Sequence, residues 1–419
     1  MKRLLPVSAL ALALSACVAT PPLVMGEVAP PLTLPSDEIQ LTVLDYTGAP
    51  LAGAQVEIDT LGAIDLVETD EAGNVVVKWN EAGISLTVDG PAHDPQTVAV
   101  DQIPSTEDLE VRLSATVLDG IVTGVGGQPL PAAAVTLNGE SVATDGEGRF
   151  QFVAAEAGEL TVERPAYMPG SASWTGSGPV AVGLEPRTVR GLYINPTRMS
   201  GDSWEELLAV ARDTEVNTMV IDIKSETGKV YYDTGVALAA EVDAEEPAYD
   251  VAEVRRQLDE LDVYLIGRVV AFQDPIAAQA RPDMSIIDTA TGQPFNEKGQ
   301  WFLDPTDVDA RQYNIDLAID ACEAGIDEIQ FDYVRYPYNV PSTGRFDGSS
   351  SEEGRPETIT TFLAAAREEL HARGCAVSAD IFGFITRDTG DGGIGQNLEL
   401  LAEVTDAISP MAVSYTHLT

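Results

Sequence analysis

Residues 330–337 are Gln-Phe-Asp-Tyr-Val-Arg-Tyr-Pro, a strand-like stretch that carries an acid and an arginine where a buried strand would end. Successive side chains of a strand face opposite sides, so Asp332 faces away from Phe331 and Tyr333. If the two aromatic residues pack against helices, Asp332 points to the other side of the sheet. An unpaired buried carboxylate is costly, so Asp332 needs a partner or a function.

Five more strand candidates with similar apolar runs lie between Arg190 and Val413, and stretches with helical spacing separate them. Near-continuous apolar strands that alternate with helices predict a parallel sheet covered by helices. A doubly wound sheet and a (β/α)8 barrel both satisfy this pattern. The six strand candidates are residues 190–196, 218–224, 264–272, 328–334, 376–384 and 406–413.

Polar residues toward the C-terminal ends of these strands favour the barrel, because catalytic groups gather at that rim. No GxGxxG or Walker-type loop supports a nucleotide-binding sheet. The polar residues at the strand ends are Asp222, Lys224, Arg268, Asp332 and Asp380.

Several motifs occur in order over roughly residues 190–411: RGLYINPTRMSG, VIDIKSETG, IGRVVAFQDP, WFLDPTD, IQFDYVRYP and SADIFGF. Together they resemble a bacterial family of proposed glycoside hydrolases that was first defined as a domain of unknown function. The resemblance implies a TIM barrel that cleaves the glycosidic bonds of a polysaccharide.

Glycoside hydrolysis needs two carboxyl groups. On this interpretation Asp332 is the nucleophile or the stabilising carboxylate, with its pKa held low by Arg268 or Lys224. The structural alternative is an Asp–Arg ion pair that closes the barrel. Asp380 is the best candidate for the second carboxyl group and Asp222 is the next, and the sequence does not decide which carboxyl is the acid.

Other residues are candidates for substrate binding. Arg268 and Lys224 lie near Asp332 on preceding strands, and Arg335 either binds substrate or clamps its loop. Trp301, near Asp304 in WFLDPTD, either stacks on a sugar ring or packs in the core. The three histidines, His93, His371 and His417, show no metal-ligand spacing, so we expect neither a metal nor another cofactor.

Residues 1–17 have the charged, apolar and small-residue regions of a signal peptide. Leu14–Cys17 resembles a bacterial lipobox, which implies a lipid on Cys17; the alternative is an ordinary signal peptide with a chance cysteine. We expect a cell-envelope protein attached to the membrane only by this lipid, with the outer membrane favoured and the protein facing the periplasm or the exterior. Residues 18–37 are Pro-rich and predict an extended tether.

Residues 38–115 and 116–188 alternate apolar and polar positions and share a G-x-P-L-x-x-A-x-V … T-D-x-x-G pattern. They resemble carboxypeptidase-regulatory-like β-sandwich modules, the second copy more closely. Asp70 and Asp145 are predicted to form turns, with Ca²⁺ binding as the less favoured alternative. The barrel domain is then residues 189–419.

Composition excludes some function classes. The chain has 67 Asp and Glu against 24 Lys and Arg, a formal net charge of −43, so it would repel nucleic acid. Cys322 and Cys375 each precede a predicted strand; a bond between them is conceivable, and two buried free thiols are favoured.

A TIM barrel has eight strands and about 250 residues, whereas only six strands are predicted before the chain ends in AVSYTHLT. We therefore expect a barrel that is truncated at its C-terminus. Two alternatives to a hydrolase remain: a non-catalytic glycan-binding or envelope scaffold, and a metal-dependent hydrolase such as a polysaccharide deacetylase. The last is weakest, because a His-rich ligand set is missing from the sequence.

Overall fold

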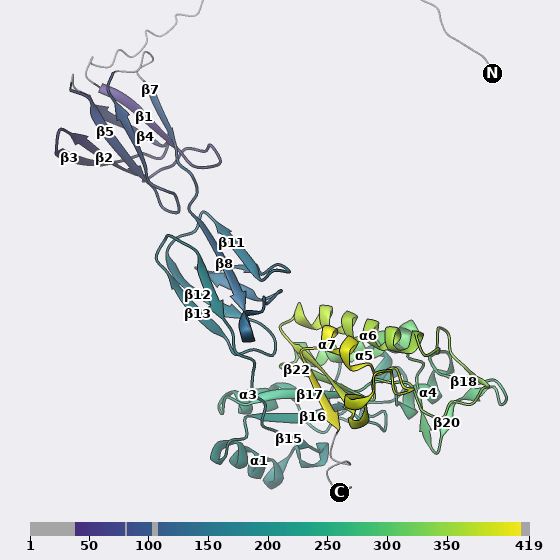
Figure 1. The fold of residues 1–419 in the computed structure, drawn as a ribbon. Helices are drawn as coiled ribbons and strands as arrows, with labels where there is room; N and C mark the ends of the chain where they lie inside the picture. Colours follow the sequence, from purple (N-terminus) through teal and green to yellow (C-terminus); the bar gives the residue numbers. More distant parts are fainter. Residues whose placement is uncertain (1–37, 80–81, 103–107, 412–419) are drawn as a thin grey trace, which may run out of the picture. The chain divides into compact units, whose positions relative to one another are not determined.

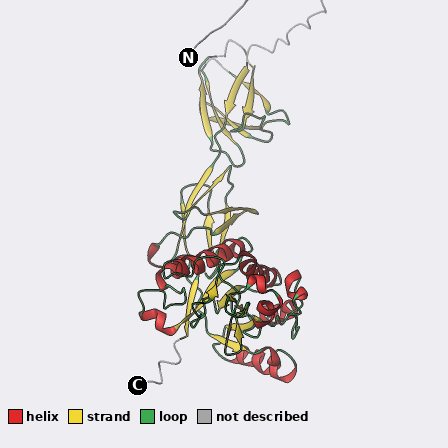
Figure 2. Ribbon diagram, turned by 90° about the vertical axis from the view of Figure 1, so that its right-hand side faces the viewer, coloured by secondary structure: helices red, strands yellow, loops and turns green. Residues whose placement is uncertain are grey.

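The computed structural model describes residues 38–79, 82–102 and 108–411. The predicted signal peptide with Cys17, the tether and residues 412–419 lie outside these ranges. The chain divides into two compact units, with the boundary after residue 115. Within the described ranges, the α-helices all follow residue 190, and Figure 2 shows the helices in red.

The first unit holds a β module with two sheets whose residues share one core. The three-stranded sheet has the order β4-β1-β7, and the four-stranded sheet has the order β3-β2-β5-β6. The strands are β1 (Glu38–Leu44), β2 (Gln55–Thr60), β3 (Ala63–Glu68), β4 (Asn74–Lys78), β5 (Ile84–Asp89), β6 (Gln96–Val100) and β7 (Asp108–Arg112).

The second β module, at the start of the second unit, repeats this topology. Its sheets have the orders β11-β8-β14 and β10-β9-β12-β13, so each strand corresponds to the strand seven places earlier. The internal repeat seen in the sequence is therefore confirmed. The strands are β8 (Val117–Thr123), β9 (Ala134–Leu137), β10 (Glu140–Ala143), β11 (Arg149–Val153), β12 (Gly158–Glu163), β13 (Gly170–Trp174) and β14 (Val180–Gly183).

Asp70 and Asp145 form turns in the two modules, as predicted. Oδ1 of Asp70 accepts hydrogen bonds from the backbone N–H groups of Ala72 and Asn74, at 2.9 and 2.8 Å. Oδ1 of Asp145 accepts the equivalent pair, at 3.0 and 2.8 Å. The glycine three residues after each Asp, Gly73 or Gly148, has a φ of +73° or +71°. Residues with a side chain rarely adopt this backbone conformation, so Gly is required there.

The remaining part of the second unit is a six-stranded parallel sheet with helices (Figure 1). Its strands follow chain order without a reversal, whereas a doubly wound sheet reverses its order at a switch point. The doubly wound alternative is therefore wrong, and the sheet is of the kind found in a TIM-type barrel. The strands are β15 (Gly191–Ile194), β16 (Thr218–Lys224), β17 (Tyr264–Val270), β22 (Glu328–Asp332), β24 (Ala376–Phe382) and β25 (Ala407–Met411).

Helices cover the outer face of this sheet, and α5, α6 and α7 lie side by side there (Figure 1). The helices are α1 (Gly201–Asp213), α2 (Ala237–Glu241), α3 (Val251–Asp259), α4 (Pro275–Ala280), α5 (Val308–Glu323), α6 (Gly354–His371) and α7 (Leu398–Val404). The outer-face strand residues pack with them in one apolar core, as Ile221, Val269, Phe331 and Ile381 illustrate. The inner face is polar, which makes it the place for a site.

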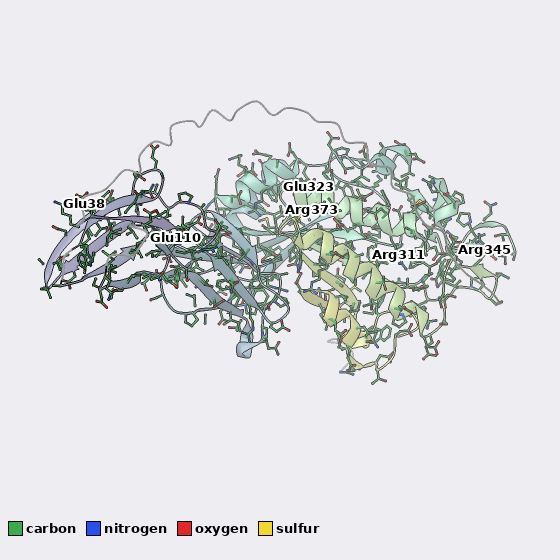
Figure 3. All side chains as sticks on the ribbon, turned by 90° about the horizontal axis from the view of Figure 1, so that it is seen from above. Glu38, Glu110, Arg311, Glu323, Arg345 and Arg373 are labelled. Atoms are coloured by element: carbon green, nitrogen blue, oxygen red, sulfur yellow. A yellow bond between two sulfur atoms is a disulfide. The ribbon has the colours of Figure 1, made fainter. Side chains whose placement is uncertain are left out.

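Cys322 and Cys375 form a disulfide, so the prediction of two free thiols is wrong. Cys322 lies at the end of α5, and Cys375 directly precedes β24. Glu323 and Arg373, labelled in Figure 3, lie beside the bond and form an ion pair of 2.9 Å. The sequence could not decide this pairing because the separation of 53 residues is bridged only by the fold.

Candidate active site

The inner face of the parallel sheet brings together four of the predicted site residues. Asp222 lies on β16, opposite Arg268 on β17. Asp332 ends β22, and Asp380 lies on the neighbouring strand β24. The pairing of these strands extends to Phe331 with Ala379, and Asp332 and Asp380 are the next residues along the two strands. Since neighbouring strands lie about 4.8 Å apart, the two carboxyl groups are close neighbours.

Arg268 joins two carboxylates at the centre of this face. Its Nε and Nη2 donate to Oδ2 of Asp332 at 3.0 and 2.7 Å. Its Nη1 donates to Oδ1 of Asp222 at 2.7 Å. All three side chains are largely buried, so the pairing is charge-assisted and held in place. Arg268 is thus the partner of the buried Asp332 carboxylate.

Asp380 has a different environment. It is 8% exposed, and burial together with the neighbouring charge of Asp332 raises its pKa to about 7, although a hydrogen bond with Ser409 acts in the opposite direction. Near neutral pH this carboxyl group can therefore hold a proton. Two neighbouring carboxyl groups whose environments separate their proton affinities are the usual basis for dividing acid and base roles.

Asp222 is a further carboxyl group on this face, and both of its oxygens accept hydrogen bonds. Burial raises its pKa, while hydrogen bonds from Tyr193 and Arg268 lower it. The Tyr193 hydroxyl donates to Oδ2 of Asp222 at 2.6 Å, and the Tyr249 hydroxyl donates to its backbone oxygen at 2.5 Å. Asp222 therefore helps to hold Arg268 in place beside Asp332.

Residues 191–415 match a protein-family model described as "Putative glycosyl hydrolase domain". The chain belongs to this family. No curated protein matches the chain. Among solved structures, a hypothetical protein from Ruminiclostridium thermocellum is 32% identical, with a TM-score of 0.41, over 45% of this chain and 96% of that chain.

Two further solved structures are similar at low identity. The PgaB (BpsB) glycoside hydrolase domain from Bordetella bronchiseptica is 12% identical, with a TM-score of 0.42, over 54% of this chain and 74% of that one. An alpha-amylase from Lactobacillus plantarum is 18% identical, with a TM-score of 0.36, over 52% of this chain. The match spans 51% of that amylase, about half of its length.

Lys224 does not reach the inner face of the glycosyl hydrolase domain. The register between β16 and β17 shifts between Asp222 and Lys224, which turns the lysine to the other side. There it is fully buried, and its Nζ donates to Asp274 at 2.9 Å and to the backbone oxygen of Ala271 at 3.2 Å. The predicted contacts of Lys224 with Asp332 and with substrate are corrected accordingly.

Arg335 lies in the loop after β22 and is 6% exposed. Its Nη1 donates to the backbone oxygen of Tyr336 at 2.9 Å. Its guanidinium lies 5.0 to 5.8 Å from the ring centroids of four aromatic residues, Phe302, Tyr333, Tyr338 and Phe382. Of the two alternatives left open by the sequence, these contacts favour the loop clamp.

Trp301 and Asp304 are held by the long segment after β17. Trp301 is partly buried against the core in the hairpin of β20 (Asn296–Glu297) and β21 (Gln300–Trp301). Asp304 is 2% exposed, and its carboxylate accepts from the backbone N–H groups of Thr306 and Asp347, at 2.8 and 2.7 Å. Both residues therefore have structural contacts, and the structure does not bring them to Arg268.

Sequence reasoning missed Tyr193, which is 55% exposed and stands over Arg268 with its ring centroid 5.8 Å from the guanidinium carbon. Alternation would have found it, since Ile194 on one side is a core residue and Leu192 on the other side packs against the core. Sequence reasoning also did not predict the unusual backbone conformation of Tyr333. Its φ of +46° is rare for a side-chain-bearing residue, and its N–H donates to Oδ1 of Asp332 at 2.6 Å.

Within the described ranges, no group of three or more His, Cys, Asp and Glu side chains is arranged to hold a metal ion. His371 bonds to Asp406 at 2.7 Å, and His93 bonds to the backbone oxygen of Pro91. In the same part of the chain, none of the helices has the length and apolar character needed to span a bilayer.

Proposed function

We propose that this chain is a glycoside hydrolase of the bacterial cell envelope that cleaves a polysaccharide with Asp332 and Asp380. One observation carries the proposal: neighbouring carboxyl groups on the inner face differ in environment, because Asp332 is paired with Arg268 and Asp380 has its pKa raised to about 7. Family membership supports a reaction on glycans.

In the first step, the protonated carboxyl of Asp380 gives its proton to the glycosidic oxygen as the bond from that oxygen to the anomeric carbon breaks. The carboxylate of Asp332 attacks the anomeric carbon and forms a glycosyl ester. Arg268 holds one oxygen of Asp332 and the Tyr333 N–H donates to the other, so the carboxylate is fixed in place for this attack.

In the second step, Asp380 is the carboxylate that takes a proton from water, and the water oxygen attacks the anomeric carbon and releases Asp332. Carboxyl groups about 5 Å apart suit this double displacement, whereas inverting enzymes need about 6.5 to 9.5 Å to admit a water. Because Asp332 and Asp380 lie on neighbouring strands, directly after the last paired residues, we propose that the reaction retains the configuration.

The proposed envelope location rests on the predicted signal peptide and on the disulfide. Disulfides persist in oxidising compartments such as the periplasm and the cell surface, and Cys322–Cys375 suits that setting. We propose that a lipid on Cys17 holds the protein at the membrane, through a Pro-rich tether and two β modules of the carboxypeptidase-regulatory-like kind. Labelling of cells with an alkyne palmitate should mark the wild-type protein and leave Cys17→Ala unmarked.

A non-catalytic glycan-binding scaffold is the second candidate function. The direct contact between Arg268 and Asp332 favours it, because an ion pair of this kind can serve structure alone. The two candidates differ in a measurable way, since a scaffold binds glycans without releasing new reducing ends.

The test is a screen of residues 18–419 against envelope and storage polysaccharides, with reducing ends as the readout. A hydrolase releases reducing ends from at least one polymer, and proton NMR of the first product should show the anomeric configuration of the substrate. Binding without cleavage of any polymer would support the scaffold, and an inverted first product would overturn the double displacement.

A further inference from the structure

Three aromatic rings gather at the end of the sheet beside Asp380. The ring centroids of Tyr338 and Phe382 are 5.7 Å apart, those of Tyr338 and Phe384 are 6.4 Å apart, and those of Phe382 and Phe384 are 6.0 Å apart. Tyr338 is 43% exposed, and the two phenylalanines are half-buried. We call these three residues the aromatic triad.

Arg335 contacts two rings of the triad. Its guanidinium carbon lies 5.0 Å from the ring centroid of Phe382 and 5.4 Å from that of Tyr338. Arg335 is itself buried and bonded to the loop backbone. Cation–π contacts of this kind fix ring positions before any ligand arrives, which lowers the ordering cost of binding.

The triad lies on the Asp380 side of the two carboxyl groups. Phe382 is two residues beyond Asp380 on β24, and it pairs with Met411 on β25, the strand farthest from Arg268. Phe384 follows in the helical turn Gly383–Arg387. Tyr193 and Arg268 lie on the opposite side of Asp332, on β15 and β17.

In glycoside hydrolysis the acid protonates the oxygen that stays with the leaving sugar. The sugar on the acid's side is therefore the leaving one. An exposed aromatic face offers a flat apolar surface to the ring hydrogens of a pyranose.

We propose that the aromatic triad is the leaving-group subsite, which stacks on a pyranose unit on the reducing-end side of the cleaved bond. The triad then selects oligomers and polymers with a sugar at that position over glycosides with a small leaving group. This inference rests on the proposed function for its direction, and its binding part can be tested separately.

Binding is measured by calorimetry with Asp332→Asn, which cannot form the glycosyl ester, and three probes: cellohexaose, the hexamer of N-acetylglucosamine, and maltohexaose. We expect at least one probe to bind, and Asp332→Asn/Tyr338→Ala to bind it about tenfold or more weakly. Tyr338→Phe in the same background keeps the ring and should keep most of the affinity. The matched control is Tyr46→Ala, which removes a tyrosine of similar exposure, 41%, from the first β module.

Kinetic measurements then test whether the triad binds the leaving-group side of the cleaved bond. In the otherwise unaltered protein, Tyr338→Ala should lower kcat/KM for the hexasaccharide about tenfold or more. Its kcat/KM for the glycosyl fluoride of the same sugar should stay within about twofold, because fluoride occupies no sugar subsite on the leaving side. An equal fall for both substrates would overturn the assignment to the leaving side.

The two proposals fail in different ways. If none of the probes binds Asp332→Asn, or if removal of the Tyr338 ring leaves the affinity unchanged, the subsite is overturned. If a probe binds through Tyr338 but the wild-type protein cleaves neither polymer nor glycosyl fluoride, the hydrolase proposal fails while the triad stands as a glycan-binding surface.

Discussion

The environments of Asp332 and Asp380 are different. Asp332 is paired with the guanidinium of Arg268, whereas Asp380 is buried beside the carboxylate of Asp332. Alternation along the strand was sufficient to predict that Asp332 faces away from the helices, and of its two candidate partners, Arg268 and Lys224, the structure shows Arg268. The same logic gave the wrong side for Lys224, because a β-bulge inserts one residue and leaves no mark in the residue types. The proton affinity of Asp380 depends on burial and on its strand neighbour, which sequence alone cannot supply.

Asp380→Asn should remove activity on a polysaccharide and at the same time stabilise the protein at high pH. The folded-state pKa of Asp380 is raised from 3.8 to about 7, so its ionisation costs stability as pH rises through that window. At one pKa unit per about 1.4 kcal/mol, the stability gain of the variant should be about 2 to 3 kcal/mol larger at about pH 8 than at about pH 5.

Urea unfolding at the two pH values measures this difference, with Asp213→Asn at the exposed end of α1 as the control. Wild-type activity should also decline above about pH 7, where Asp380 loses its proton. An equal change in stability at both pH values would mean that Asp380 is not the carboxyl group with the raised pKa.

At the scale of the elements, all six strands of the parallel sheet were predicted within a few residues of their observed bounds. Their runs of apolar residues are long because the outer face is buried under helices. The two-residue strands between Ile287 and Trp301 and the short helix α2 were not predicted, since elements of this length have no measurable period. The disulfide depended on the fold, which brings the end of α5 next to the start of β24.

Removal of this disulfide should destabilise the second unit without abolishing its fold. The bond closes a loop of 53 residues, for which the chain-entropy relation gives about 4 kcal/mol. Thermal unfolding of Cys322→Ala/Cys375→Ala should therefore occur well below that of the wild type, and a reducing agent should lower the wild-type midpoint but not that of the variant. Detection of two reactive thiols in the unreduced, denatured wild-type protein would contradict the bond.

Over the whole molecule, the dominant physical feature is a net charge of −43. Self-repulsion of this size opposes the compact state, and salt reduces it because the screening length falls from about 30 Å at 0.01 M to about 3 Å at 1 M. Residue-level reasoning predicted that nucleic acid is an unsuitable partner, and the same charge disfavours strongly anionic glycans at the inner face. Composition cannot say more, because net charge carries no information about the fold.

The thermal midpoint should accordingly rise with sodium chloride between about 0.02 and 0.5 M, and potassium chloride should have the same effect because screening depends on charge and concentration. Differential scanning calorimetry measures both series. A midpoint that is independent of salt, or an increase produced by one cation only, would show that diffuse repulsion is not what limits stability.

The central claim is that Asp332 is the catalytic carboxylate of a glycosyl hydrolase domain. The most direct test is kcat of Asp332→Asn on the polysaccharide found in the screen, measured beside Asp213→Asn. The account predicts a loss of about 10⁴-fold or more for Asp332→Asn, with circular dichroism and the thermal midpoint close to wild type, because Arg268 keeps its contact with Asp222. Activity within tenfold of wild type, or loss of the fold together with activity, would contradict it and leave Asp332 as a structural partner of Arg268.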